Sequence, residues 1–240
     1  CTYKDIWRNS IMSDYKATRP ATLKNKCFNS FDVFAYMKKD YLPELQVQYG
    51  VKILYHPKCE ADDIIGHLAP FLISRNFPMV YIIANDNDYL QICNSKIKMI
   101  KGNITHGELI SDSFSNHDGE RYLIRKILLG DISDNIRPCM VNKVLLDSNI
   151  LNIKELNYTL EDKIYKTVSK TNIELLLKDE EGYSFFSQLL EAIYTGDIKD
   201  GRDPRLELIR NFYENTVLMY FKMIPKELKQ ELESRFASYF

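Results

Sequence analysis

The sequence predicts an α/β protein with a parallel sheet in its first half and helices in its second. Two apolar runs rich in β-branched residues, 51–55 and 79–84, flank a segment of helical period, 61–76. A strand–helix–strand order is typical of parallel strands joined by a crossover helix. After residue 120, apolar residues recur at helical spacing almost to the C-terminus. These observations together define the fold class.

The elements follow in order along the chain. Residues 5–19 are polar and basic, and predict a helix that ends at Pro20. Residues 31–42 have apolar side chains at helical spacing, and Pro43 is expected to interrupt that helix. Residues 51–55 predict a short buried strand. The segment 61–76 is expected to be an amphipathic helix.

Two further strands are predicted. The run 79–84 is the strongest strand signal, and its unbroken apolar character indicates burial on both faces. Residues 97–101 predict another strand, followed by a turn at Gly102-Asn103. An apolar helix is expected over 122–129.

Composition limits the class of protein. The chain has 240 residues, of which 45% are hydrophobic, enough for one good-sized domain with room for a smaller helical one. Its five cysteines are scattered, so we expect reduced thiols rather than disulfides or a zinc site. The sequence shows neither an apolar run of membrane-spanning length nor a signal peptide, so we expect a soluble protein of the cytoplasm.

Charge is unevenly distributed along the chain. Residues 1–58 contain 10 Lys or Arg against 5 Asp or Glu, whereas residues 59–134 contain 7 against 11. A basic segment followed by an acidic one suits a protein that binds phosphates with one part and metal ions with another. Ordinary variation of surface charge explains the same numbers, so the pattern permits this interpretation without requiring it.

Three acidic clusters are candidates for chemistry. Glu60, Asp62 and Asp63 open the helix predicted over 61–76, where carboxylates also serve as ordinary N-caps. Asp86 and Asp88 follow the strand 79–84. In an extended chain their side chains would point to the same side, although an Asx-rich turn is also common there.

The third cluster follows the apolar helix 122–129. Asp131 and Asp134 lie in the segment Gly130-Asp-Ile-Ser-Asp-Asn-Ile, which a helix C-cap and polar turn would also explain. Carboxylates brought together repel each other unless they bind cations, and hard oxygen ligands favour Mg²⁺ or Mn²⁺. Two such ions about 4 Å apart can clamp a phosphodiester between an activated water and the leaving oxygen.

These clusters, in this order, resemble the signature motifs of flap endonucleases and of bacterial or phage 5′–3′ exonucleases. The motifs are Glu60-Ala-Asp-Asp, then Asn85-Asp-Asn-Asp after a strand, then the Gly130 segment. A fourth match, Trp7-Arg8 with Tyr15-Lys16-Ala-Thr-Arg19, resembles the element leading into the family's helical arch. The Trp-Arg pair and the chain's size are most similar to phage RNase H, and the match runs from about residue 7 to 143.

The resemblance implies a Rossmann-like (PIN-like) nuclease core over residues 1–118, with a basic arch region at about 8–45. Residues 119–240 would form a helical region with a helix–turn–helix-type element that binds duplex DNA. The implied metal ligands, for two Mg²⁺ or Mn²⁺ ions, are Glu60, Asp62, Asp63, Asp86, Asp88, Asp131 and Asp134. The implied catalytic cations over the phosphate are Lys16 and Arg19. The implied DNA contacts are Arg8, Lys126, Arg137 and Lys143.

Two departures from the family pattern stand out. Family members begin with strands that carry two further aspartates, and neither strand is visible here, so the core is expected to lack them. The family's glycine-rich hairpin is replaced by residues 136–143, which contain no glycine. Close approach of a backbone to phosphates is harder without glycine, which puts the hairpin geometry and a monovalent-cation site in question.

The resemblance implies a structure-specific 5′ nuclease of bacterial or phage-infected cells. Expected substrates are 5′ flaps, nicked or gapped duplexes and RNA–DNA hybrids, cut by a monomer. Replication proteins such as a single-strand-binding protein or a sliding clamp are expected partners, and a membrane is not. The alternative is a non-catalytic binder of branched DNA that kept the fold and lost part of the metal site. An RNA-cleaving nuclease with a related acidic core is a further alternative, against which the Gly130 segment speaks.

Overall fold

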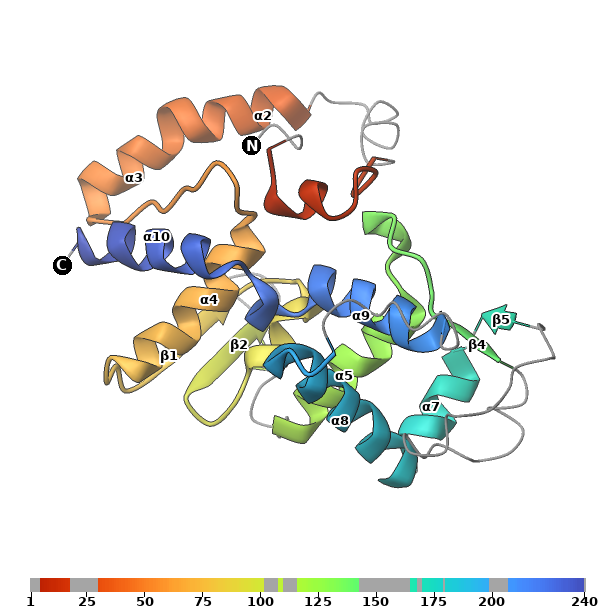
Figure 1. Cartoon of the computed structure of the whole chain (residues 1–240). Coiled ribbons are helices and arrows are strands. Elements are labelled where there is room, and N and C mark those ends of the chain that lie inside the picture. Colours follow the sequence, from red (N-terminus) through yellow and green to blue (C-terminus); the bar gives the residue numbers. More distant parts are fainter. Residues whose placement is uncertain are drawn as a thin grey trace. The chain divides into compact units, whose positions relative to one another are not determined.

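The structure, a computed structural model, describes residues 5–17, 30–101, 108–109, 116–142, 165–167, 170–178, 180–198 and 207–239 (Figure 1). The predicted turn at Gly102-Asn103 lies outside these residues. The chain divides into two units, which are described separately. Unit 1 comprises residues 1–64, 133–135 and 225–240, and unit 2 comprises residues 65–132 and 136–224.

Helices make up most of the described residues of both units. The α-helices are α2 (Ser30–Tyr36), α3 (Leu42–Tyr49), α4 (Ala61–Ser74), α5 (Asn116–Leu129), α7 (Lys170–Lys178), α8 (Glu180–Thr195), α9 (Glu207–Met219) and α10 (Lys226–Ala237). Shorter helical turns are η1 (Trp7–Ser10), the π-turn η2 (Met37–Tyr41), η3 (Asn87–Ile92), η5 (Ile132–Asp134) and η7 (Phe221–Met223). The strands are β1 (Val80–Ile83), β2 (Ile97–Lys101), β3 (Glu108–Leu109), β4 (Met140–Asn142) and β5 (Tyr165–Thr167). No helix of the described residues has the length and apolar character needed to cross a membrane.

Unit 2 contains a three-stranded sheet in the order β1-β2-β3. Strands β1 and β2 are parallel, with Val80 opposite Ile97 and Ile83 opposite Ile100. Strand β3 runs antiparallel to β2. The two strands predicted at 79–84 and 97–101 and the parallel character of the sheet are therefore confirmed. The strand–helix–strand unit that predicted the parallel sheet, from 51–55 through 61–76 to 79–84, is not formed, because residues 51–55 are not a strand.

The apolar run of β1 predicted burial on both faces, but only one face of the strand is buried. Ile82 is 5% exposed, but its neighbours Tyr81 and Ile83 are 57% and 63% exposed. Successive side chains of a strand point to opposite faces, so one face of β1 contacts the core and the other is exposed. An unbroken apolar run shows that a strand is favourable, but not how many of its faces are covered.

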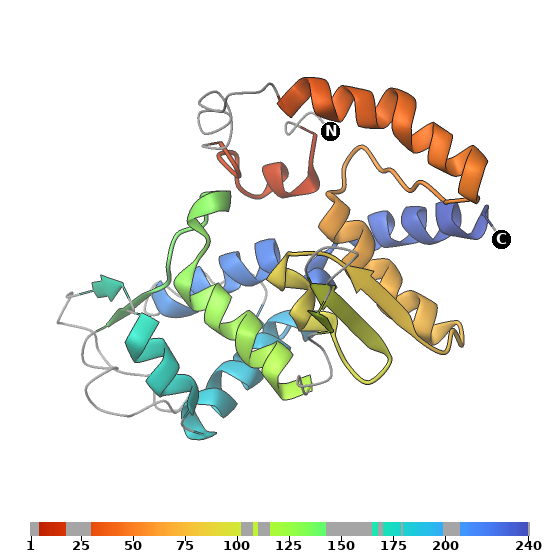
Figure 2. The ribbon, with the colours of Figure 1, turned by 180° about the vertical axis from the view of Figure 1, so that it is seen from behind.

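The helices α5, α7, α8 and α9 pack together in unit 2 (Figure 2). Phe186 of α8 is fully buried, with its ring 5.0 Å from that of Phe185 and 5.4 Å from that of Phe212. The predicted helical second half is thus confirmed in its main part. The two-stranded antiparallel pair β4–β5 was not predicted, since strands of three residues carry too little periodicity to detect.

Helix α5 also lies directly on η3, the turn that follows β1. A Cβ atom placed on Gly119 would lie 2.4 Å from the carbonyl oxygen of Leu90, which is far inside van der Waals contact. Only a glycine allows this backbone-to-backbone approach. The contact fixes the start of α5 against the turn that carries Asp88.

Two predictions for unit 1 are wrong. Residues 51–55 form no strand, and two of their carbonyl groups are bound by side chains near the C-terminus. The Tyr239 hydroxyl donates to the carbonyl oxygen of Ile53 at 2.7 Å, and the Arg235 guanidinium donates to that of Tyr55 at 2.9 Å. Residues 5–17 form the short turn η1 and further turns instead of a helix. Lys16 has a φ of 57°, a left-handed conformation that a right-handed helix excludes.

Helix α4 confirms the segment predicted at 61–76, and Asn76, with a φ of 66°, follows its end. The interruption expected at Pro43 does not occur. Pro43 occupies the first turn of α3, where its missing N–H costs no helical hydrogen bond. The irregularity falls instead on the π-turn η2 just before it.

Candidate functional site

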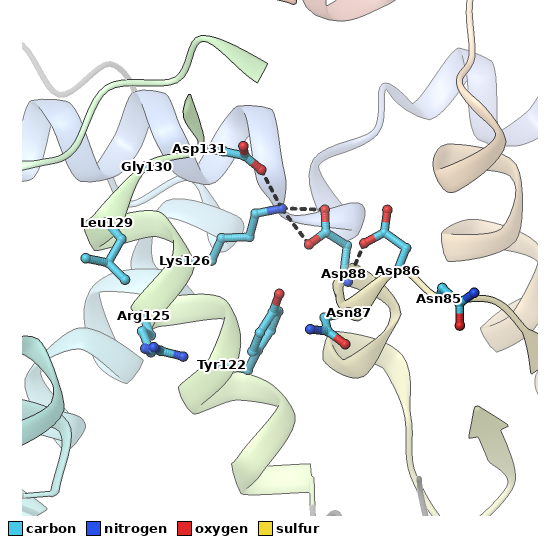
Figure 3. Close-up of a pocket in the computed structure, with 10 residues that line it drawn as sticks. All are labelled: Asn85, Asp86, Asn87, Asp88, Tyr122, Arg125, Lys126, Leu129, Gly130 and Asp131. Atoms are coloured by element: carbon cyan, nitrogen blue, oxygen red, sulfur yellow. Dashed lines mark hydrogen bonds and ion pairs between the residues drawn. The ribbon is translucent and has the colours of Figure 1, made fainter. Parts of the chain in front are cut away.

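A pocket of about 680 Å³ lies in unit 2, beyond the ends of β1 and α5 (Figure 3). We call it the acidic pocket. It is lined by Asn85, Asp86, Asn87, Asp88, Tyr122, Arg125, Lys126, Leu129, Gly130 and Asp131. Three of the carboxylates that the sequence singled out therefore line one cavity.

Asp86 and Asp88 meet through a capping turn rather than along an extended strand. Asp86 has extended backbone geometry and caps η3, and its Oδ1 accepts the backbone N–H of Asp88 at 2.9 Å. The chain turns immediately after Asp86, so the expectation that both residues share one side of a strand does not apply. The Asx turn and the gathering of carboxylates are both present, because the turn itself brings the carboxylates together.

Lys126 of α5 joins the carboxylates of this pocket. Its Nζ lies 2.5 Å from both carboxylate oxygens of Asp88 and 3.0 Å from Oδ2 of Asp131 (Figure 3). Asp131 reaches this position because Gly130, with a φ of 68°, turns the chain out of α5. A Cβ on Gly130 would lie 2.5 Å from the carbonyl oxygen of Ile136, so glycine is required there.

The charges of the pocket do not balance fully. Burial raises the pKa of Asp88 above its ordinary value of 3.8, although Lys126 pulls it down. Burial lowers the pKa of Lys126, but Asp88 and Asp131 outweigh it and raise that pKa above its ordinary value of 10.5. Burial also raises the pKa of Tyr122 to about 12, so its hydroxyl remains protonated. The half-buried Asp88 carboxylate therefore holds a proton more readily than a free carboxylate does, even beside Lys126.

A second cluster lies in unit 1 and centres on Glu60, just before α4. Lys16 forms an ion pair with Oε1 of Glu60, and its Nζ lies 3.5 Å from Oδ2 of Asp134. The Tyr15 hydroxyl lies 2.9 Å from Oε2 of Glu60 and 3.2 Å from Oδ2 of Asp134. The backbone N–H of Lys16 donates to the carbonyl oxygen of Asp134 at 3.0 Å. Three sequence motifs thus meet at one point of unit 1.

Asp63 forms the buried floor of this cluster and has no exposed surface. Its Oδ2 accepts from Arg8 Nη1 at 2.8 Å, from Trp7 Nε1 at 3.1 Å and from the backbone N–H of Glu60 at 2.9 Å. The last bond is one half of a capping box. The Arg8 guanidinium lies 4.5 Å from the centre of the Trp7 ring and also contacts Glu60 at 3.2 Å. We call Trp7, Arg8, Tyr15, Lys16, Glu60, Asp63 and Asp134 the buried ion cluster.

The cations of this cluster keep Glu60 ionised. Burial raises its pKa, but Lys16 and Arg8 outweigh that effect and bring the pKa below the ordinary 4.5. For Arg8, burial lowers the pKa, while Asp63, Tyr15 and Glu60 raise it above the ordinary value. The Tyr15 pKa is also raised, first by burial, so this hydroxyl donates to the carboxylates.

We expect Glu60→Gln to flatten the loss of stability in acid. A carboxyl group whose pKa is lowered by folding stabilises the protein above its unfolded pKa, here 4.5. That contribution disappears as the pH falls from 4.5 through the lower folded pKa. Urea unfolding at pH 7 and pH 3.5, followed by the fluorescence of the single tryptophan, Trp7, measures it.

The variant should be less stable than the parent at pH 7, and the difference should shrink at pH 3.5. The exposed Glu227→Gln serves as the matched control and should show a small, pH-independent change. An equal difference between parent and Glu60→Gln at both pH values would contradict the role given to Glu60.

The structure divides the predicted site residues between the two units. Asp86, Asp88, Lys126 and Asp131 gather in unit 2, and Lys16, Glu60, Asp63 and Asp134 gather in unit 1. Asp62 is half-buried in the first turn of α4. Arg19 and Lys143 lie outside the described residues.

Two predicted DNA contacts have other surroundings than expected. Arg8 is 3% exposed, and its guanidinium is directed at Asp63 and Glu60 rather than at solvent. Lys126 is bound by carboxylates. Arg137, by contrast, has an exposed side chain, as a phosphate contact requires.

Sequence reasoning missed several residues that build these clusters. Trp7 and Tyr15 were named as parts of a motif, without a role of their own at the acidic clusters, yet both donate hydrogen bonds to carboxylates. Asn215 of α9 was not singled out. Its buried amide donates to the carbonyl oxygens of Ile127 at 2.8 Å and Arg137 at 2.9 Å, and so holds the chain on either side of Asp131. The motif that joins Trp7-Arg8 to Tyr15-Lys16 was a usable signal for Trp7 and Tyr15. No local signal marks Asn215.

The carboxylates of both clusters are the donors that a hard divalent cation prefers. Their spacing in the described residues does not match a metal site. Within the described parts of the chain, no three His, Cys, Asp or Glu side chains are spaced to bind a metal ion. In the acidic pocket the Lys126 ammonium occupies the point on which Asp88 and Asp131 converge. Carboxylate oxygens are the ligands that Mg²⁺ and Mn²⁺ prefer, and these already surround a cation.

Comparison with known proteins agrees with these motifs. Residues 2–118 match the family described as the N-terminal resolvase-like domain of 5′–3′ exonucleases. A 5′–3′ exonuclease of Buchnera aphidicola subsp. Schizaphis graminum is 28% identical over 202 residues. That alignment covers 79% of this chain but only 65% of the relative, so the chain spans less than two thirds of the relative's length.

Solved structures show the same fold. The bacteriophage T5 5′-exonuclease with divalent zinc ions bound matches 98% of this chain and 80% of its own, with a TM-score of 0.57 at 14% identity. The T5 flap endonuclease, in a pseudo-enzyme–product complex with DNA and metal ions, matches equally well at 13% identity. These likenesses support a resolvase-like, PIN-type nuclease fold with a parallel sheet and helices. The family match and these relatives agree with the four ordered motifs: residues 2–118 are similar to the N-terminal resolvase-like domain of 5′–3′ exonucleases.

Proposed function

We propose that this chain is a metal-dependent 5′ nuclease that hydrolyses a phosphodiester near the 5′ end of a DNA strand. The observation that carries the proposal is the convergence of Asp88 and Asp131 on one cationic point beside Asp86. Carboxylates held this close around a positive charge have the chemistry of a divalent-cation site. The relatives in the 5′–3′ exonuclease family support the same reading.

Two Mg²⁺ or Mn²⁺ ions are the proposed cofactors. Bound divalent cations supply the charge that activates water and stabilises the leaving oxygen of the phosphodiester. Asp86, Asp88 and Asp131 are the proposed ligands in unit 2. The proposed ligands in unit 1 are Glu60, Asp62, Asp63 and Asp134.

The chain's own cations neutralise the phosphate. Lys16 is held by Glu60 and Asp134, and with Arg19 it is proposed to face the attacked phosphate and its developing negative charge. Water attacks phosphorus, the bond to the 3′ oxygen breaks, and the products are a 5′-phosphate and a 3′-hydroxyl. No covalent enzyme intermediate is involved.

The proposed substrates are 5′ flaps, nicked or gapped duplexes and RNA–DNA hybrids. Lys126, Arg137 and Lys143 are the proposed contacts to the duplex backbone, within a helix–turn–helix-type element that follows Gly130. We place the protein, as a monomer, in the cytoplasm of a bacterial or phage-infected cell. The proposed partners are replication proteins, such as a single-strand-binding protein or a sliding clamp.

The test is cleavage of a 5′-labelled flap duplex by the full chain with Mg²⁺ or with EDTA. We expect cutting near the junction only with Mg²⁺, and a rate about ten- to a hundredfold lower for Asp86→Asn. Asparagine keeps the oxygen that caps η3 and removes only the charge, so the fold is preserved. Asp197→Asn, at an exposed position, is the charge-matched control and should cut at the parent rate.

Cutting that continues in EDTA, or an Asp86→Asn rate equal to that of the control, would refute the metal site. Binding of the flap duplex without any cleavage would instead support a non-catalytic binder of branched DNA. The arrangement of the buried ion cluster gives that alternative a specific basis, because Asp63 is already bound by Arg8 and Trp7.

A further inference from the structure

Lys126 has two roles in conflict. Its position on α5, one turn before Gly130, suits contact with a DNA phosphate, but its ammonium lies among the carboxylates of the acidic pocket (Figure 3). Three oxygens lie within 3.0 Å of Nζ, two from Asp88 and one from Asp131. A lysine held in this way cannot also bind a phosphate.

The ammonium and a divalent cation compete for the same oxygens. The side chains of Lys126, Asp88 and Asp131 are 18%, 24% and 19% exposed, so the group is largely but not wholly shielded from water. A divalent ion carries twice the charge of the ammonium and attracts the same carboxylates more strongly. The two cations also repel each other, so the ion and the ammonium exclude one another from this point.

The acidic pocket has room for a displaced Lys126 side chain. It projects into a cavity of about 680 Å³ that opens to solvent. Lysine has a flexible four-carbon stem with a compact charge at its end, so a small rotation moves the ammonium by several ångströms. On leaving the carboxylates, the Lys126 ammonium loses its counter-ions, and a phosphate is the natural new partner for it in a protein that binds DNA.

We propose that Lys126 couples divalent-cation binding to DNA binding, serving as the internal counter-ion of Asp88 and Asp131 in the metal-free protein and as a phosphate ligand once a cation has displaced it. This inference rests on the proposed function. Lys126 is thus a positioning residue in the metal-free state and a DNA contact in the loaded state. Linkage requires the coupling to be reciprocal, so DNA also raises the affinity for the cation.

The first experiment measures Mn²⁺ binding to the full chain without DNA, by electron paramagnetic resonance. Lys126→Met preserves most of the side-chain volume and removes the competing charge. We expect it to bind Mn²⁺ about tenfold more tightly than the parent, within the usual range of coupling between two ligands. Lys96→Met, an exposed site with the same change in net charge, should bind as the parent does. An affinity equal to or weaker than that of the control would overturn the proposal.

The second experiment measures binding of a fluorescent nicked duplex with and without Ca²⁺ at constant ionic strength. Ca²⁺ should raise the affinity of the parent and of Lys96→Met for DNA, and should raise that of Lys126→Met about tenfold less. Equal enhancement in all three proteins would overturn the coupling while leaving the proposed nuclease intact. A parent chain that binds neither Mn²⁺ nor DNA would refute the proposed function itself, and this inference with it.

A third measurement uses the unaltered protein, so it does not depend on a variant that folds. Lysines are labelled with an amine-reactive reagent. The extent of labelling at each lysine is measured by mass spectrometry with and without Mn²⁺. Labelling of Lys126 should rise several-fold when Mn²⁺ is present, whereas labelling of Lys96 should not change. Unchanged labelling of Lys126 at saturating Mn²⁺ would show that the ammonium stays with the carboxylates, and would overturn the proposal.

Discussion

Arg8→Met should lower the free energy of unfolding by about 3–5 kcal/mol, because it leaves the buried charge of Asp63 without its counter-ion. Asp63 has no exposed surface, and the Arg8 side chain is only 4% exposed. Water therefore cannot take the place of the guanidinium. Methionine has a similar length and is apolar, so the loss is one of charge and hydrogen bonding rather than of volume.

Urea unfolding followed by Trp7 fluorescence measures this effect where it occurs, because the Trp7 indole donates to the same oxygen of Asp63. Arg210→Met is the control, since Arg210 is half-exposed and its ion pair with Glu214 spans 4.0 Å. Exposed pairs of this kind contribute about 0–1 kcal/mol. If the two variants lost the same stability, the guanidinium of Arg8 would not be the counter-ion of the buried Asp63 carboxylate.

Lys16→Ala should lower the maximal cleavage rate about 100- to 1000-fold and leave the Michaelis constant nearly unchanged. A charge placed to meet the developing negative charge of a transition state contributes to the chemical step and little to ground-state binding. The Lys16 side chain is only 4% exposed and is held by Glu60 and Asp134, so its direction is set before substrate arrives. Preorganisation of this kind is what makes a single cation effective.

Steady-state kinetics on the flap duplex separate the two constants. Lys178→Ala, an exposed lysine at the end of α7, is the matched control and should cut at the parent rate. A Lys16→Ala variant with an unchanged maximal rate and a raised Michaelis constant would assign Lys16 to substrate binding alone. Trp7 fluorescence checks that the variant remains folded, since Lys16 also neutralises Glu60.

The parts of the fold that were predicted correctly depend on neighbours in sequence. The helix at Ala61–Ser74 and the strand at Ile97–Lys101 follow from local periodicity, and their hydrogen bonds lie within the element or with an adjacent strand. The segment 51–55 has an equally good local pattern. It forms no strand, and its contacts are with distant residues: Arg235 and Tyr239, 180 and 186 residues away, bind the carbonyl groups of Tyr55 and Ile53. No local signal contains that information.

The candidate site, too, was predicted only in the part that depends on local sequence. The acidic residues were found because three short motifs occur in a fixed order, which is a property of the sequence. Their partners were not found, because pairing is a property of the folded chain. Lys126 is 38 residues from Asp88, and Tyr15 is 119 residues from Asp134. Sequence therefore predicted which side chains carry the charge, and the structure adds what balances it.

The contact between Gly119 and Leu90 has an evolutionary consequence. It joins two backbones, so the distance between the turn with Asp88 and the helix with Lys126 does not depend on any side chain between them. Mutations can then replace the apolar residues around this junction, one after another, and change the stability of the protein without moving the charged groups apart. At this junction, selection must preserve the absence of a side chain at position 119. A single glycine thereby frees many neighbouring positions to vary.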